Sequence, residues 1–215
     1  MALQNPPVGH GAIAAATLME ALSYTTTDIA DSFLIEPRMN RDERGFVGEL
    51  LRCDWVAPLE FVQWNLVSSS GRTLRGMHWH ALHHDLIAPV AGRILVGLSD
   101  LRAGSPTEGR AMLVGLDAQD PLSVVVPPGV AHGFYSEEST TTLYAVTRYW
   151  DGEDEFGVAF DDPGLGVKWP VRRSDVILSA RDAELPGLAE GPSPPRFQAH
   201  ALSPLKPARG PSSAV

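Results

Sequence analysis

Short apolar runs separated by turn-forming residues constrain the fold of this chain more than any other feature of its sequence. From residue 46 to residue 148 these runs recur about every 8–12 residues, bounded by Gly, Pro, Asn or Asp, which is typical of an all-β sandwich or barrel. The run at 140–148 alternates between two faces, and no segment here has a sustained 3.6-residue apolar stripe. The predicted strands are Phe46–Leu51, Phe61–Val67, Leu74–His80, Leu86–Val90, Ile94–Ser99, Ala111–Leu116, Leu122–Val126, Gly133–Tyr135 and Thr140–Arg148.

Two terminal segments differ in composition from this central region. Residues 1–28 are small, polar and weakly patterned, and we expect an N-terminal arm there. Residues 189–215 hold six prolines and few large apolar residues, and we expect a flexible tail because proline has no amide donor for a sheet. The working domain is therefore predicted to span residues 29–188, a length that fits one domain.

Net charge and cysteine content exclude several classes of protein. The chain of 215 residues carries 26 acidic and 17 basic residues, and a net charge of -9 argues against binding nucleic acid. The most apolar stretch, Leu86–Leu98, is broken by Arg93 and is shorter than the ~20 residues that a membrane-spanning helix needs. The single cysteine, Cys53, excludes an intrachain disulfide framework and fits a reducing compartment. We expect a cytoplasmic protein.

Histidines concentrate where chemistry is expected. Five of the seven lie between residues 78 and 132, and on a strand His78 and His80 would point to one face. The run at 83–84 is interpreted as surface or core histidines, whereas His132 follows a Pro-Pro-Gly turn into a predicted strand. His78, His80, Asp85 and Gly92, followed by the P-x-G-x-x-H of residues 127–132, resemble the two-part pattern of the cupin superfamily. That resemblance implies a small β-barrel, often with a metal held by histidines and a carboxylate.

A narrower resemblance covers nearly all of residues 33–187. The chain resembles the dTDP-4-dehydrorhamnose 3,5-epimerase family, with eight blocks in that family's order. These are residues 42–49 (DERGFVGE), 63–65 (QWN), 74–78 (LRGMH), 100–107 (DLRAGSPT), 127–134 (PPGVAHGF), 143–144 (LY), 161–170 (DDPGLGVKWP) and 178–182 (LSARD). The resemblance implies an all-β, cupin-type antiparallel β-barrel (jelly roll) with short C-terminal helical or turn segments.

The resemblance also implies an isomerase that acts at C3, C5 or both of a nucleotide-linked 4-keto-6-deoxyhexose, with dTDP as the expected nucleotide. A proton next to the ketone is removed to give an enolate and is returned to the opposite face, which requires a base, an acid and stabilisation of the oxyanion. By motif, His78 is the base, Asp182 orients it and stabilises its imidazolium, and Tyr144 is the acid.

The family pattern assigns the binding residues too. Arg44 and Arg75 match positions that hold the diphosphate, where a forked guanidinium suits paired oxygens. The other expected substrate-binding residues are Glu49, Gln63, Asn65 and His132. Tyr149 or Trp150 could stack on the base. The resemblance further implies a homodimer, in which the segment around Arg44–Glu49 crosses to the neighbouring subunit, and it implies no cofactor.

Three positions depart from the family pattern: Asp85 stands where the family usually has a Lys that neutralises the enolate, His80 where Gln is usual, and Val96 where Asp is frequent. One explanation is a monoepimerase or slow relative in which His132 polarises the ketone. A second is a metal-binding cupin, an isomerase or dehydratase, with His78, His80, Asp85 and His132 as ligands. A third is a non-catalytic sugar-nucleotide binding protein. The retained Tyr144 and Asp182 favour the first explanation, so the expected site is metal-free.

Overall fold

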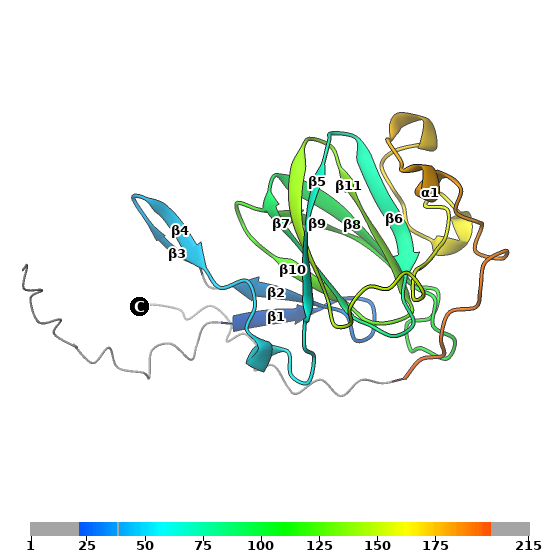
Figure 1. Cartoon of the computed structure of the whole chain (residues 1–215), viewed down its shortest axis with the longest axis horizontal. Helices are drawn as coiled ribbons and strands as arrows, with labels where there is room; N and C mark the ends of the chain where they lie inside the picture. The colour runs from blue at the N-terminus through cyan, green and yellow to red at the C-terminus, as the bar shows by residue number, and fades with distance from the viewer. Residues whose placement is uncertain (1–21, 38, 199–215) are drawn as a thin grey trace, which may run out of the picture.

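A computed structural model describes residues 22–37 and 39–198, and it consists almost entirely of two facing β-sheets (Figure 1). The first sheet has six strands in the spatial order β1 (Leu22–Thr26), β2 (Phe33–Pro37), β10 (Ser123–Val126), β7 (Asp85–Ala91), β12 (Thr140–Val146) and β5 (Gln63–Ser69). The second has five, in the order β13 (Phe156–Gly157), β6 (Thr73–Trp79), β11 (Val130–Ser136), β8 (Arg93–Asp100) and β9 (Ala111–Asp117). Neighbouring strands are antiparallel in both sheets, so the predicted all-β class is confirmed.

The remaining elements are short. β3 (Met39–Asp42) and β4 (Gly45–Gly48) form a separate hairpin that projects away from the sheets (Figure 1). The 3-10 turns are η2 (Cys53–Trp55), η3 (Pro163–Leu165) and η4 (Arg173–Asp175), and α1 (Ala180–Ala183) is the one α-helix in the described part of the chain. No helix among the described residues is long and apolar enough to cross a membrane.

The core lies between the two sheets and is built by strand alternation. Ile87 of β7 faces inward and packs with Val96 and Phe134 of the second sheet. The neighbours of Ile87, Leu86 and Ala88, point to the opposite face and pack under the segment that contains η2. The outer face of the second sheet is covered in the same way by the chain from residue 156 to residue 188. Both sheets are thus covered on much of their outer faces, although β5 at the edge of the first sheet stays exposed, and this explains why several strands have continuous apolar runs.

The predicted domain boundaries do not coincide with the edges of this architecture. β1 begins inside the segment expected to be an arm, and all five of its residues pair with β2. The segment expected to be a tail is described as far as residue 198, where the Phe197 amide donates to the Ala103 carbonyl and Arg102 stacks on the Phe197 ring. The prolines in this segment do not prevent it from packing on the domain, because the packing uses the Phe197 amide and ring and needs no continuous strand pairing. The rest of both expected extensions lies outside the described residues.

Candidate active site

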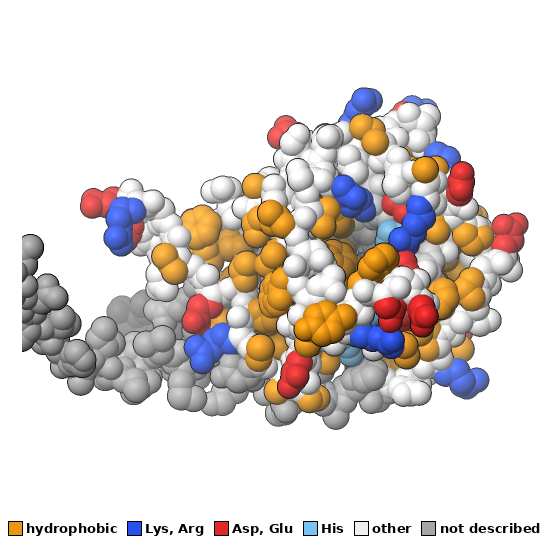
Figure 2. Space-filling model, in the orientation of Figure 1, with side chains coloured by type: hydrophobic (Ala, Val, Ile, Leu, Met, Phe, Trp, Pro, Cys, Tyr) orange, Lys and Arg blue, Asp and Glu red, His pale blue; other side chains and the backbone are white. Residues whose placement is uncertain are grey.

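A pocket of about 400 Å³ opens between the two sheets and collects most of the residues predicted to act on the substrate. Histidine atoms are visible inside a hollow flanked by basic side chains in Figure 2. Of the predicted site residues, seven line this pocket: Gln63, Asn65, Arg75, His78, His132, Tyr144 and Asp182. They come from strands of both sheets and from α1, so different functional groups line the two walls of the cleft.

His78 and Asp182 form a hydrogen-bonded pair, as the resemblance implies. His78 Nε2 lies 2.7 Å from Asp182 Oδ1, and the carboxylate can only accept, so Nε2 carries the proton and, in the neutral ring, Nδ1 keeps the lone pair. Burial is the largest single influence on Asp182 and would raise its pKa. The hydrogen bond to His78, the charge of that ring and the hydrogen bonds from Gly76 and Ser179 together outweigh burial and lower the pKa below the usual range. Asp182 therefore stays charged beside the imidazole ring.

Local sequence fixes the positions of both partners. Ser179 caps α1 and its hydroxyl accepts a hydrogen bond from the Asp182 amide at 3.0 Å, which explains the Ser-x-x-Asp spacing. Gly76, two residues before His78, approaches Gly133 of β11 so closely that a Cβ would lie 2.6 Å from the Gly133 Cα. A side chain at Gly76 would push apart the two strands that carry His78 and His132.

Tyr144 faces the pocket from the sheet opposite to His78. Its hydroxyl lies 2.5 Å from His132 Nε2, while His132 Nδ1 lies 3.1 Å from the Val130 carbonyl, which can only accept. The Tyr144 hydroxyl therefore donates to His132. Burial, followed by the nearby Asp85 charge, raises the pKa of Tyr144 well above its usual value and keeps the hydroxyl protonated. The same burial lowers the pKa of His132 well below its usual value and keeps its ring neutral.

Polar side chains of β5 and β6 also line the cleft, beside Tyr144 on one wall and His78 on the other. Gln63 Nε2 donates to Asn65 Oδ1 at 3.0 Å, and alternation along β5 directs both side chains to one face. Arg75 is held by the Ser69 hydroxyl and the Ser68 carbonyl, each at 3.0 Å. Since both partners of Arg75 are neutral, its charge remains available for an anion.

Arg44 and Glu49 are the predicted binding residues that the structure does not bring to the pocket. Arg44 is exposed at the tip of the β3–β4 hairpin, where it pairs with Asp42, and this pairing lowers the pKa of the Asp42 carboxyl. Glu49 is also exposed and lies 3.6 Å from Arg52. Within one chain neither residue can touch a ligand held between the sheets.

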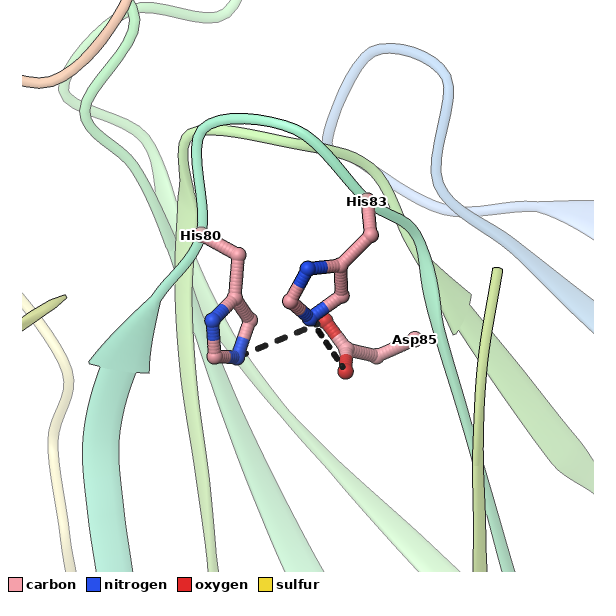
Figure 3. A group of neighbouring side chains, drawn as sticks. All are labelled: His80, His83 and Asp85. Carbon is pink, nitrogen blue, oxygen red and sulfur yellow. Dashed lines mark ion pairs between the residues drawn. The ribbon is translucent and has the colours of Figure 1, made fainter. Parts of the chain in front are cut away.

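Two further histidines enter the pocket beside Asp85, from the turn between β6 and β7 (Figure 3). His80 Nε2 lies 3.8 Å from Asp85 Oδ2, and His83 Nε2 lies 3.7 Å from Asp85 Oδ1. His83 was interpreted from the sequence as a surface or core histidine, and it is buried, but its ring also lines the pocket, which the sequence did not indicate. Burial is also the main cause that raises the pKa of Asp85 to about 7 and lowers that of His83 to about 4.

Three more residues line the pocket. Trp150 was one of two candidates for stacking on the base, whereas Glu155 and Arg181 were not predicted from the sequence. Glu155 accepts from Arg181 at 2.5 Å and from the Trp150 indole at 3.0 Å, and it faces His78 Nδ1 at 3.7 Å. Burial is the largest single influence on Glu155 and would raise its pKa, but the hydrogen bond from Arg181 together with the charges of His80, His78 and Arg181 lowers the pKa overall. The available signal was the acidic run at 151–155 directly before a Phe-Gly pair, which resembles an ordinary exposed turn.

Comparison with known proteins agrees with this geometry. Residues 26–190 match the family model described as dTDP-4-dehydrorhamnose 3,5-epimerase. The chain belongs to this epimerase family. The dTDP-4-dehydrorhamnose 3,5-epimerase of Sinorhizobium fredii is 32% identical over 185 residues, which cover 82% of this chain and 94% of the relative. The resemblance seen in the sequence is thus confirmed, and with it the isomerase class.

Solved structures of epimerases in this family have the same fold. The 3,5-epimerase of Legionella pneumophila, in complex with dTDP-4-keto-L-rhamnose, superposes with a TM-score of 0.77 at 32% identity and covers 83% of this chain and 100% of that one. A 3'-monoepimerase of Streptomyces bikiniensis, in complex with dTDP-quinovose, has a TM-score of 0.70 at 29% identity over 76% of this chain and 86% of its own. Epimerases of both one and two carbons are therefore built on this architecture.

Proposed function

We propose that this protein epimerises C3, C5 or both of a dTDP-linked 4-keto-6-deoxyhexose. The observation that carries the proposal is the placement of His78 and Tyr144 on opposite walls of one pocket, each held by its own partner. An epimerase must remove a proton from one face of a carbon and return one to the other face. A base and an acid from opposite sheets supply these two faces.

His78 Nδ1 is the base atom in this proposal. Its lone pair is free to accept the substrate proton because Nε2–H is donated to Asp182. The imidazolium that forms is stabilised by the charged Asp182 carboxylate, which stays ionised because its pKa is low. Proton removal leaves an enolate, whose oxyanion has to be stabilised by hydrogen-bond donors or positive charge in the pocket.

Tyr144 is the acid that reprotonates the enolate. Its raised pKa keeps the proton on the hydroxyl until the strongly basic enolate carbon is presented. His132, hydrogen-bonded to that hydroxyl, positions it. Arg75, Gln63 and Asn65 support the binding of the diphosphate and the nucleotide in the pocket.

The complete site is proposed to form in a cytoplasmic homodimer. Arg44 and Glu49, which resemble binding residues of the family, lie on a hairpin that projects away from their own pocket. A second copy of the chain would bring this hairpin to the neighbouring cleft. The lone Cys53 supports a reducing compartment.

Solvent deuterium exchange tests the reaction without knowledge of the product. In D₂O the wild-type protein should incorporate deuterium next to the ketone of a dTDP-4-keto-6-deoxyhexose, read by mass spectrometry. His78→Ala should slow this exchange by about 10²–10⁴-fold, the usual contribution of a positioned base. Asp117→Asn, a change at a half-buried position at the end of β9 and outside the pocket, is the control and should exchange like the wild type. Exchange at near wild-type rate in His78→Ala would refute the assignment.

A further inference from the structure

The turn between β6 and β7 places two imidazoles and one carboxylate around a single point in the pocket wall. His80 Nε2, His83 Nε2 and an Asp85 carboxylate oxygen all lie within 4.8 Å of one another, and all three side chains are buried (Figure 3). The three residues come from one six-residue stretch, with the spacing H-x-x-H-x-D, and His78 is not among them. His78 instead points to Asp182.

Hydrogen bonds on the far side of the two rings fix which nitrogen carries the proton. His80 Nδ1 lies 2.7 Å from the Asp154 carbonyl, which can only accept. His83 Nδ1 lies 3.0 Å from Asp154 Oδ2, and this carboxylate already accepts from the amides of Ala81 and Leu82. Both rings therefore donate from Nδ1, and in the neutral form both direct an Nε2 lone pair towards Asp85.

With Asp85 ionised, the two Nε2 lone pairs face carboxylate oxygens, so hydrogen-bond acceptors face acceptors. The separations of 3.8 Å and 3.7 Å between the two Nε2 atoms and the Asp85 oxygens are too long for hydrogen bonds. Asp85 Oδ1 is buried and has no hydrogen-bond partner among the described residues. A buried carboxylate is normally paired or coordinated to a metal, because burying a charge without a partner is costly.

A metal ion resolves this conflict if the three side chains close in on one point. Two ligands that each lie about 2.1 Å from a tetrahedral zinc ion are about 3.4 Å apart. The two histidine–Asp85 separations end on different carboxylate oxygens and exceed this distance by a few tenths of an ångström. With one oxygen of Asp85 as the ligand, the three ligand atoms lie within 4.8 Å of one another. Ring nitrogens that bind metals typically donate their other N–H to a carboxylate or a backbone carbonyl, and Asp154 supplies one of each. Imidazole and carboxylate together suit divalent first-row transition metals.

We propose that His80, His83 and Asp85 form a binding site for one divalent first-row transition metal ion, with an open coordination position towards the pocket. Three protein ligands with a free position are typical of catalytic rather than structural metal sites. This set differs from the one considered from the sequence, because His83 takes the place of His78 and the base remains free. His132 Nε2 also faces Asp85, at 3.7 Å, but it accepts from the Tyr144 hydroxyl and is not counted as a ligand. An ion here would add positive charge to the pocket that holds His78 and Tyr144.

Metal content of the full-length, tag-free protein tests the site directly. After removal of metals with a chelator and incubation with Zn²⁺, the wild type should retain about one zinc ion per chain through gel filtration. Co²⁺ in place of Zn²⁺ should give a visible d–d absorption band that saturates at one equivalent. Failure of the wild type to retain Zn²⁺ and to bind Co²⁺ at this stoichiometry would overturn the proposal, whether or not the variants fold.

Substitutions then identify the ligands. Asp85→Asn and His83→Gln should each weaken Zn²⁺ binding by more than the ~10–100-fold expected for Asp154→Asn, which removes only a partner of a ligand. His78→Ala is the matched control, because it removes a pocket histidine outside the set and should retain full zinc. Equal zinc loss in His78→Ala and Asp85→Asn would overturn this ligand set. Far-ultraviolet circular dichroism checks that each variant is folded.

The metal measurement is independent of the proposed reaction, because it needs no sugar nucleotide. A protein that binds zinc at these residues but exchanges no deuterium would refute the epimerase function and leave the metal site standing. If the wild-type protein exchanges deuterium but binds no metal, the metal site is refuted and the epimerase function stands.

Discussion

At the scale of single residues, His78 and Asp182 have different proposed roles: His78 removes the proton, and Asp182 orients and stabilises the His78 ring. Asp182→Asn keeps a hydrogen-bonding side chain at 2.7 Å from the ring but removes the charge that stabilises the imidazolium. We expect deuterium exchange to slow by about 10–100-fold in Asp182→Asn, less than in His78→Ala, as for other groups that act through a neighbour. Exchange rates of the two variants at one pH check the order. The reverse order would show that Asp182, and not His78, takes the proton.

Tyr144 should affect inversion more than proton removal. Tyr144→Phe removes the hydroxyl that donates to His132 and leaves the His78–Asp182 pair intact. The enolate should still form, but reprotonation from the far face should fall by about 10²-fold or more. Deuterium incorporation and epimer formation, measured in one reaction by mass spectrometry and NMR, should then diverge. An equal loss of both would contradict the role of Tyr144 as the terminal acid.

How much of the site was predictable differs from residue to residue. His78, Tyr144 and Asp182 lie in separate sequence blocks, and only the resemblance to a family could bring them to one pocket. His83 is buried, as one of its two interpretations had it, but its place in the pocket was not predicted. His84 looks identical in the sequence, and the turn that places the His83 ring against Asp85 has no sequence signature. Glu155 was missed because an acidic run usually marks a solvated turn, whereas Arg181, Trp150 and His78 enclose this carboxylate.

At the scale of elements, every predicted strand overlaps an observed one, because alternation and turn residues are local signals. The central strands of both sheets were found within a few residues of their ends. β1, β2 and β3 were missed because the sequence before residue 46 has weak alternation, and their pairing is set by tertiary contacts. β13 has only two residues, too few for any periodicity, although it pairs with β6 next to His78.

The end of β8 holds a buried charge network that should matter for stability rather than catalysis. Asp100 accepts from the Arg102 guanidinium at 2.8 Å and 2.9 Å and from the hydroxyls of Ser105 and Thr107, both at 2.6 Å. Breaking this pair leaves the buried Arg102 with the more distant Asp31 carboxylate, at 3.6 Å, and the Ala30 carbonyl, so the cost is at most the ~3–5 kcal/mol of a fully broken buried pair. Asp100→Asn should lower the free energy of unfolding in urea by that order. Asp117→Asn, which breaks an exposed pair with Arg93, is the matched control and should change stability little.

The same network predicts loss of stability in acid. Burial alone would raise the pKa of Asp100, but the hydrogen bonds from Arg102, Ser105 and Thr107 lower it below the usual range. Its stabilising contribution is therefore complete above the unfolded-state pKa of about 3.9 and is lost as pH falls through the lower folded-state value. The difference between the urea midpoints of the wild type and Asp100→Asn, compared from pH 7 to pH 2.5, should narrow as pH falls. A constant gap between the two proteins would contradict this linkage.

At the scale of the whole molecule, a single chain leaves apolar side chains exposed and holds two predicted binding residues away from its own pocket. Trp64 and Leu66 project outward from β5, the edge strand of the six-stranded sheet, with exposed fractions of 46% and 71%. Val47 on the projecting hairpin is 72% exposed. An edge strand with apolar side chains favours pairing with another chain. The proposed homodimer would cover these residues and carry the hairpin to a second pocket.

Subunit mass and mixing of variants test this assembly. Sedimentation at micromolar concentration should give the mass of two chains, and Leu66→Glu should shift it towards one. Arg44→Ala should lower exchange by weakening binding of the sugar nucleotide, while His78→Ala removes the base. If Arg44 serves the neighbouring pocket, a mixed dimer of these two variants holds one pocket with both residues intact. An equimolar mixture, unfolded and refolded together, should therefore regain roughly a quarter of wild-type exchange, since random pairing makes half of the dimers mixed. No regain beyond the sum of the two separate variants would place Arg44 outside its partner's pocket.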